Sequence, residues 1–221
     1  RCYNNIPQKG YSYWFFDALV VASSDDGYNS EEAQGIPSSG MYADNNSASF
    51  HNIRDAHDGH GGGNTGYWNR SWQQIRLCTQ FIEVIDNAAV HAETNRGRFK
   101  AEARVLRAFF YMELVKWFGK VPVLDATVPF DADFSTLTRS SVYDVAKFIV
   151  ADCDAALAEP NLPWRIDNEN DAMRVTKALA LALKTKAMLF AASPLHNESQ
   201  NHWEEAYTTA KDAVTRLKAN G

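Results

Sequence analysis

The sequence predicts an all-α fold of stacked helical hairpins, with a long irregular loop inserted near the N-terminus. Apolar residues recur with helical spacing in successive segments from residue 68 to residue 217. Two of these segments carry apolar stripes on opposite faces, which indicates helices packed on both sides, as in an array of helix pairs. Residues 23–66 are instead rich in Gly, Ser, Asn and Asp, the composition of a loop.

Length and charge exclude several classes of protein. The chain has 221 residues, enough for one domain of ordinary to large size or two small ones. Its net charge of -5 argues against a nucleic-acid surface. The three cysteines, Cys2, Cys78 and Cys153, are too few and too far apart for a disulfide framework or a zinc cluster. We expect Cys78 and Cys153 to pack as small core residues.

The N-terminal part is predicted to be a short helix followed by the long loop. Residues 11–22 are apolar and end at the turn signal "SSDDG", which favours a helix. Loops as long as residues 23–66 are usually functional or disordered, and the spaced aromatics Tyr28, Tyr42 and Phe50 argue against simple disorder. We therefore divide the chain into residues 1–66 and a helical region, 67–221, which together form one structural unit.

The first two helices of that region differ in how many faces are apolar. Residues 68–89 carry one broad stripe, with Thr79 among the residues predicted to face away from it. Residues 98–118 carry two stripes and end at Gly119, as helices often do. Arg104 and Arg107 lie in a polar seam between these stripes. We expect them to pair with acids on neighbouring helices, although such a pair could also bind an anion.

Three further helices follow a linker at residues 129–137. Residues 142–157 form a one-sided helix with a Ser or Thr cap in "TRSS", and residues 203–217 form the most regular amphipathic helix. Residues 175–194 alternate like a strand, but Ala, Leu, Met and Lys favour a helix, which we expect to be buried on two sides. The acidic run "DNEND", residues 167–171, is expected to cap a helix starting near Arg174.

A weak internal repeat indicates the type of hairpin. Aligning Lys100 with Lys177 also matches Leu106 with Leu183 and Arg107 with Lys184. The segment "WEEAYTTAKDA" has the W-x2-A-x3-A pattern of the first helix of a tetratricopeptide repeat (TPR). The sequence therefore predicts TPR-like helical hairpins, an α-α superhelix, with inserted loops.

Several segments in a fixed order resemble one protein family. They are "GYWNRSWQQIRLCTQFIEVI", "FKAEARVLRAFFYMELVKWFGKVPV", "TRSSVYDVAKFIVADCDAAL" and "RVTKALALALKTKAMLF". Together they resemble the SusD/RagB nutrient-binding lipoproteins of Bacteroidetes, most specifically in the AEA-x2-LRAFFY-x2-L-x3-FG-x-VP stretch, Ala101 to Pro122. The resemblance covers residues 67–217 well and residues 23–66 loosely.

The resemblance implies a non-enzymatic, surface-exposed outer-membrane lipoprotein without a cofactor. It would capture glycans or oligosaccharides and deliver them to a SusC-like TonB-dependent transporter, contacting the membrane only through a lipid anchor. Members of the family are considerably longer, so the C-terminal part of the family's chain is absent here. The lipidated cysteine is not evident either, because no apolar run precedes Cys2.

The expected glycan contacts lie just before and at the start of the first helix of residues 67–221. Aromatic faces stack on sugar rings, while polar side chains bind sugar hydroxyls. Both kinds of side chain occur here, and in the family the loop before the first TPR-like helix often supplies an aromatic and a polar contact. We therefore expect glycan contacts at Arg54, Asp58, Asn64, Tyr67 and Trp68. In the alternative interpretation, Tyr67 and Trp68 only fasten the helix start to the core.

Two other functions were weighed. His51, His57 and His60 stand beside acidic residues, but a glycine-rich loop does not fix ligands as a helical HExxH motif does, so we expect no metal site and no metal-assisted hydrolase. The sequence also lacks a nucleophile elbow and a phosphate-binding loop, whereas the two carboxylates of a glycosidase are spaced in three dimensions and leave no such motif. That the protein is not an enzyme is therefore what the family resemblance implies. The remaining alternative is a TPR-like scaffold that binds a protein or peptide in its groove.

Overall fold

The computed structural model describes residues 2–3, 6, 67–90, 92–197 and 201–220. Across these residues every regular element is helical, so the all-α prediction is confirmed. The predicted helix at residues 11–22 and the predicted loop at 23–66 lie outside the described residues. The main helices are α2 (Tyr67–Val84), α3 (Glu93–Phe118), α4 (Val142–Leu157), α5 (Lys177–Ala191) and α6 (Trp203–Asn220).

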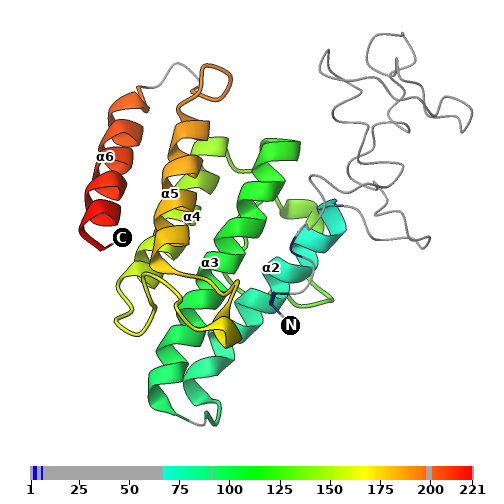
Figure 1. The fold of residues 1–221 in the computed structure, drawn as a ribbon. Helices are drawn as coiled ribbons and strands as arrows, with labels where there is room; N and C mark the ends of the chain where they lie inside the picture. Colours follow the sequence, from blue (N-terminus) through cyan, green and yellow to red (C-terminus); the bar gives the residue numbers. More distant parts are fainter. Residues whose placement is uncertain (1, 4–5, 7–66, 91, 198–200, 221) are drawn as a thin grey trace, which may run out of the picture. The chain divides into compact units, whose positions relative to one another are not determined.

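The chain divides into two compact units. One consists of residues 3–72, and the other of residues 1–2 together with residues 73–221. In the second unit α3 packs on α4, α4 on α5 and α5 on α6, while α3 also contacts α5. Figure 1 shows these helices side by side, with irregular segments joining their ends. Neighbours in sequence are thus neighbours in space, as in a TPR-like array.

Helix α3 is buried on both faces, as its two stripes predict. Leu106, Phe110 and Leu114 are buried on one side, and Val105 and Met112 on the other. The helix ends at Gly119, whose φ of 67° suits glycine, and the Gly119 N–H donates to the Val115 carbonyl oxygen at 3.0 Å. Because α3 is enclosed, the charged residues in its seams need partners within the fold.

The N-terminal caps of α4 and α5 come from hydroxyl side chains. Ser141 accepts a hydrogen bond from the backbone N–H of Asp144 at 3.0 Å, as predicted for α4. Helix α5 begins at Lys177, and its cap is Thr176. The expectation that "DNEND" caps this helix is therefore wrong. Thr176 directly precedes the helix, whereas residues 169–171 form a separate 3-10 turn, η4 (Glu169–Asp171).

Helix α5 is buried on only one broad face, which corrects the prediction of burial on two sides. Its buried residues include Ala180, Leu183 and Met188. A second stripe, Leu179, Ala182, Lys186 and Leu189, is exposed. The two stripes look alike in sequence because apolar character does not reveal whether a neighbouring helix is present.

Helix α6 buries small residues and exposes large ones. Ala206 and Ala213 are buried, while Trp203, Tyr207 and Val214 are all exposed. Side chains as small as alanine let helices approach closely, which fits the packing of α6 on α5.

Candidate functional site

The predicted glycan contacts are only partly within the described residues. Arg54, Asp58 and Asn64 lie outside them. Tyr67 is the first residue of α2, and only its backbone is described. Trp68, the second residue of α2, is the predicted contact whose side chain the structure shows.

The Trp68 ring is held at one edge by another tryptophan. Trp72 lies one helical turn further along α2, and the two ring centroids are 5.6 Å apart at an interplanar angle of 71°. This edge-to-face geometry is favourable for aromatic pairs. Trp68 itself is half-buried, so part of it remains accessible to solvent. The ring is therefore oriented by packing without being enclosed, as a sugar-stacking platform requires.

Sequence reasoning missed Trp72 as part of this arrangement. The spacing of four residues in "WNRSW" could have revealed it, because residues i and i+4 lie on the same side of a helix. The pair also joins the two interpretations of Trp68. One edge of the ring packs against Trp72, and Trp68 is only half-buried.

The arginines of α3 form a buried ion cluster with α4. Arg107 donates from Nε and Nη2 to both carboxylate oxygens of Asp152, at 2.7 and 2.8 Å, and Arg104 Nη1 donates to the same carboxylate at 3.0 Å. The side chains of Arg107 and Asp152 are only 5% and 3% exposed. The expectation that these arginines pair with an acid on a neighbouring helix is confirmed. A bidentate carboxylate occupies the guanidinium edge that an anion would need.

Arg107 also links the helices to other parts of the fold. Its Nη1 donates to the Thr79 hydroxyl at 3.2 Å and to the Asp125 carbonyl oxygen at 3.3 Å. The prediction that Thr79 faces away from the core is wrong, because the buried guanidinium needs an acceptor on α2. Burial alone would lower the pKa of Arg107, but the hydrogen bonds and charge of Asp152 raise it.

A second polar anchor fastens the segment after α3. The Tyr111 hydroxyl accepts from the Leu124 N–H at 2.8 Å and donates to the Leu124 carbonyl oxygen at 3.2 Å. Burial raises the pKa of Tyr111 to about 12. Glu102, in the other seam of α3, accepts from Arg98 at 3.0 Å and from Arg174 at 2.7 Å. These polar groups of α3 therefore hold the scaffold together.

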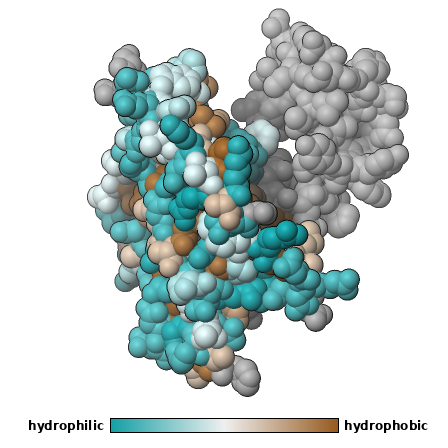
Figure 2. Space-filling view, turned by 60° about the vertical axis from the view of Figure 1, so that its left-hand side comes forward, coloured by the Kyte–Doolittle hydropathy of each residue, from teal (hydrophilic) through white to brown (hydrophobic). Residues whose placement is uncertain are grey.

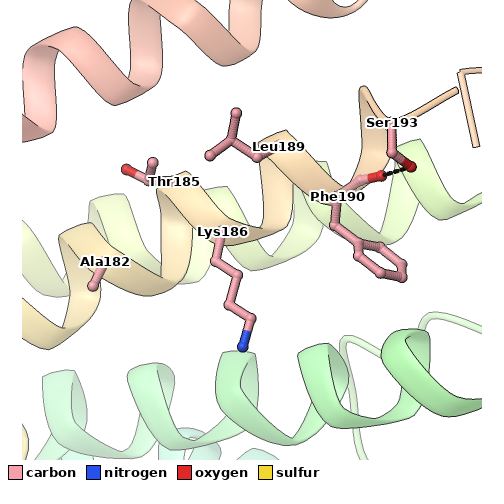
Figure 3. Close-up of a pocket in the computed structure, with 6 residues that line it drawn as sticks. All are labelled: Ala182, Thr185, Lys186, Leu189, Phe190 and Ser193. Carbon is pink, nitrogen blue, oxygen red and sulfur yellow. Dashed lines mark hydrogen bonds between the residues drawn. The ribbon is translucent and has the colours of Figure 1, made fainter. Parts of the chain in front are cut away.

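An apolar groove lies along the exposed side of α5. It has a volume of about 440 Å³ and is lined by Ala182, Thr185, Lys186, Leu189, Phe190 and Ser193. Figure 3 shows Leu189 on the side of α6 and Lys186 extending toward α3. On the molecular face shown in Figure 2, hydrophobic residues are interspersed with hydrophilic ones. The groove has the character of a packing surface, since most of its lining is apolar.

Comparison with known proteins identifies the family. Residues 14–189 match the SusD-like family described as "Starch-binding associating with outer membrane". This chain belongs to the SusD-like family. The resemblance seen in the sequence is therefore confirmed. The description of the family names a binding activity. No match is found among curated proteins.

Solved SusD-like structures are similar to this chain in fold. A SusD homolog from Bacteroides thetaiotaomicron is 30% identical with a TM-score of 0.55, over 67% of this chain and 28% of that one. A SusD-like protein from Bacteroides fragilis is 26% identical with a TM-score of 0.58, over 70% and 27%. A SusD-like carbohydrate-binding protein from the same species is 25% identical with a TM-score of 0.58, over 78% and 30%. The chain thus spans less than a third of the length of these structures.

The described part of this SusD-like chain offers neither a metal site nor a membrane span. Among the described residues, no three His, Cys, Asp or Glu side chains gather closely enough to hold a metal ion. The histidines at residues 51, 57 and 60 lie outside that part. Within the same part, no helix is both long and apolar enough to cross a membrane.

Proposed function

We propose that this SusD-like chain belongs to a glycan-capturing protein of an outer-membrane uptake system, which binds oligosaccharide without transforming it. The observation that carries the proposal is the match of most of the chain to a family described as starch-binding and associated with the outer membrane. The similar Bacteroides fragilis structure is itself named a carbohydrate-binding protein.

In this proposal the sugar is held at the start of α2 and in the segment before it. Trp68 stacks on the apolar face of a sugar ring, with its edge steadied by Trp72 at 5.6 Å. Arg54, Asp58 and Asn64 bind the ring hydroxyls, and Tyr67 completes the contact set. The helices α3, α4, α5 and α6 form a packed scaffold in the same chain, and the ion cluster around Asp152 stabilises that scaffold.

Capture is followed by delivery to a second protein. The protein is surface-exposed, is held to the outer membrane by a lipid anchor, and passes its oligosaccharide to a SusC-like TonB-dependent transporter. The family's association with the outer membrane supports this placement. No nucleic acid takes part, in keeping with the net charge of -5.

A glycan array tests the proposal. The full-length protein is applied to host and plant glycans, with and without a chelator, and selective binding that survives the chelator is expected. Trp68→Ala should weaken binding about tenfold or more, about 1.4 kcal/mol. Trp203→Ala is the matched control because it removes an exposed tryptophan from α6. If the Trp68 variant bound glycan with the same affinity as wild type, Trp68 would not be a glycan contact.

The groove along α5 favours one alternative function, a TPR-like scaffold for a protein or peptide. Its apolar lining and the exposed residues Trp203 and Tyr207 resemble surfaces that bind helical segments. If the folded protein bound no glycan on the array, this alternative would be favoured over glycan capture.

A further inference from the structure

Two positively charged side chains face one tryptophan ring at one end of the α5–α6 hairpin. Trp164 lies in the segment between α4 and α5, and the ammonium of Lys177 is 5.8 Å from the centroid of its ring. The guanidinium carbon of Arg216 is 5.7 Å from the same centroid. Lys177 is the first residue of α5, and Arg216 lies near the end of α6. Figure 1 shows that α5 begins and α6 ends at the same end of this hairpin.

The position of Trp164 is fixed from both sides. Leu162 and Val175, in the segment that carries it, are each only 1% exposed. The backbone N–H of Lys177 donates to the Pro163 carbonyl oxygen at 2.9 Å, which ties this segment to the first residue of α5. Trp164 itself is half-buried, and its indole N–H makes no hydrogen bond to the described part of the chain. The ring is therefore held in place with a polar edge that can still donate.

The charge of Lys177 lies where a protein fold does not favour a cation. The residue is 9% exposed, and within the described residues its ammonium has neither a carboxylate partner nor a hydrogen-bond acceptor. It stands at the N-terminus of α5, where the positive end of the helix dipole favours anions. Arg216 brings a second positive charge to the same ring, and its own partner, Asp212, is 3.6 Å away and 50% exposed. One carboxylate thus faces two cations and a helix N-terminus, so a further negative charge would be stabilised here.

A purely structural role would not explain the charge of Lys177. An apolar side chain at this position would pack against Trp164 without the cost of desolvating an unpaired ammonium. Lys211 shows the ordinary arrangement, since its ammonium lies 5.8 Å from the Tyr207 ring on the exposed surface of α6, where bulk water solvates it. The arrangement at Trp164 is instead suited to an anion that comes from outside the protein.

We propose that Trp164, Lys177 and Arg216 bind the carboxylate of an acidic oligosaccharide, one that contains uronic acid units. The ammonium and the guanidinium pair with the carboxylate through charge-assisted hydrogen bonds, which are stronger than neutral ones. The indole N–H donates to a neighbouring hydroxyl, while the half-buried ring contacts the sugar that carries the carboxylate. The inference rests on the proposed glycan-capture function and names a substrate class for it. Trp164 belongs to the compact unit of residues 1–2 and 73–221, whereas Trp68 belongs to that of residues 3–72.

Matched pairs of ligands test the proposal by removing the charge alone. Trisaccharides of galacturonic, glucuronic and mannuronic acid are titrated by calorimetry into the full-length protein, each beside its methyl ester, in which the carboxylate is neutralised. We expect at least one acid to bind about tenfold or more tighter than its ester. This ratio should fall about threefold or more in Lys177→Met and in Arg216→Met, persist in Lys177→Arg, and be unchanged in the control Lys211→Met. Because the ratio compares two ligands on one variant, a change in stability alone does not alter it.

Several results would overturn the proposal. One is equal affinity for every acid and its ester, and another is a ratio that stays unchanged in Lys177→Met. A third is loss of the preference in sodium acetate but not in sodium chloride of the same ionic strength, because the site would then bind small carboxylates rather than an acidic sugar. If neutral glycans still bound in these cases, the glycan-capture proposal would stand. If the folded protein bound no glycan here or on the array, both proposals would be wrong.

Discussion

Replacing Asp152 with Ala should severely destabilise the fold. The carboxylate of Asp152 accepts two hydrogen bonds from Arg107 and one from Arg104, and its side chain is 3% exposed. Without it, the guanidinium of Arg107 would remain buried with only the Thr79 hydroxyl and a backbone carbonyl as acceptors. An uncompensated charge in the interior is one of the costliest single defects that a fold can carry.

The expected loss follows from what is known of buried ion pairs. Removing one partner costs about 3–5 kcal/mol of unfolding free energy. For a domain of this size that corresponds to a fall of about 6–20 °C in melting temperature. The matched control is Asp154→Ala, two residues away on α4. Asp154 pairs with Lys184 at 2.6 Å but is 49% exposed, so its removal should cost about 1 kcal/mol or less.

Urea unfolding followed by circular dichroism measures both variants and a third. Arg107→Met combined with Asp152→Ala removes the buried charges together, so the double variant should recover a large part of the loss. Arg104 is 29% exposed and can turn to water. The reasoning would be refuted if Asp152→Ala were no less stable than Asp154→Ala, or if the double variant were no more stable than Asp152→Ala.

Three further predictions concern other parts of the scaffold. Burial raises the pKa of Tyr111 to about 12, so the stability that its neutral hydroxyl contributes is complete below pH 10 and is lost as pH rises to 12. Urea titrations should therefore show the unfolding free energy of wild type falling by about 3 kcal/mol more than that of Tyr111→Phe over this range. Gly119→Ala should cost about 1–3 kcal/mol in the same assay because φ is 67°, whereas Gly97→Ala, which meets only the end of the Glu159 side chain, should change little. Hydrogen bonds from Lys147 and Tyr143 lower the pKa of Glu205, so this contact is present near neutral pH and lost as pH falls. Protection factors of the α6 amides, which correct for the intrinsic pH dependence of exchange, should therefore fall in acid in wild type but not in Glu205→Gln.

The helices could be predicted from sequence because their signals are local. Helix α3 shows this best, since its apolar stripes, the terminal Gly119 and the following Pro122 all lie within one continuous segment. The cap of α4 at Ser141 is equally local. Such features depend on residues at most a few positions apart, and one sequence contains them completely.

The sequence-based predictions of burial were wrong where burial depends on residues far apart in the sequence. The exposed stripe with Leu179 and Leu189 on α5 has the composition of a buried one, and only the placement of α3, α4 and α6 shows which side is covered. Thr79 is buried because Arg107 reaches it from another helix. The proposed contacts at Trp68 and in the loop before it depend in the same way on how separate segments meet.

The pairing of Asp152 with Arg107 nevertheless had a signal in the sequence. Val145, Ile149, Asp152 and Ala156 share one stripe of the predicted helix, so Asp152 interrupts a buried apolar face with a carboxylate. A charge at such a position needs an opposite charge from a neighbouring buried face. The two-sided helix that precedes it in sequence supplies Arg107 in its polar seam. Reading charged residues at apolar positions as pairs between consecutive helices would therefore have predicted this contact.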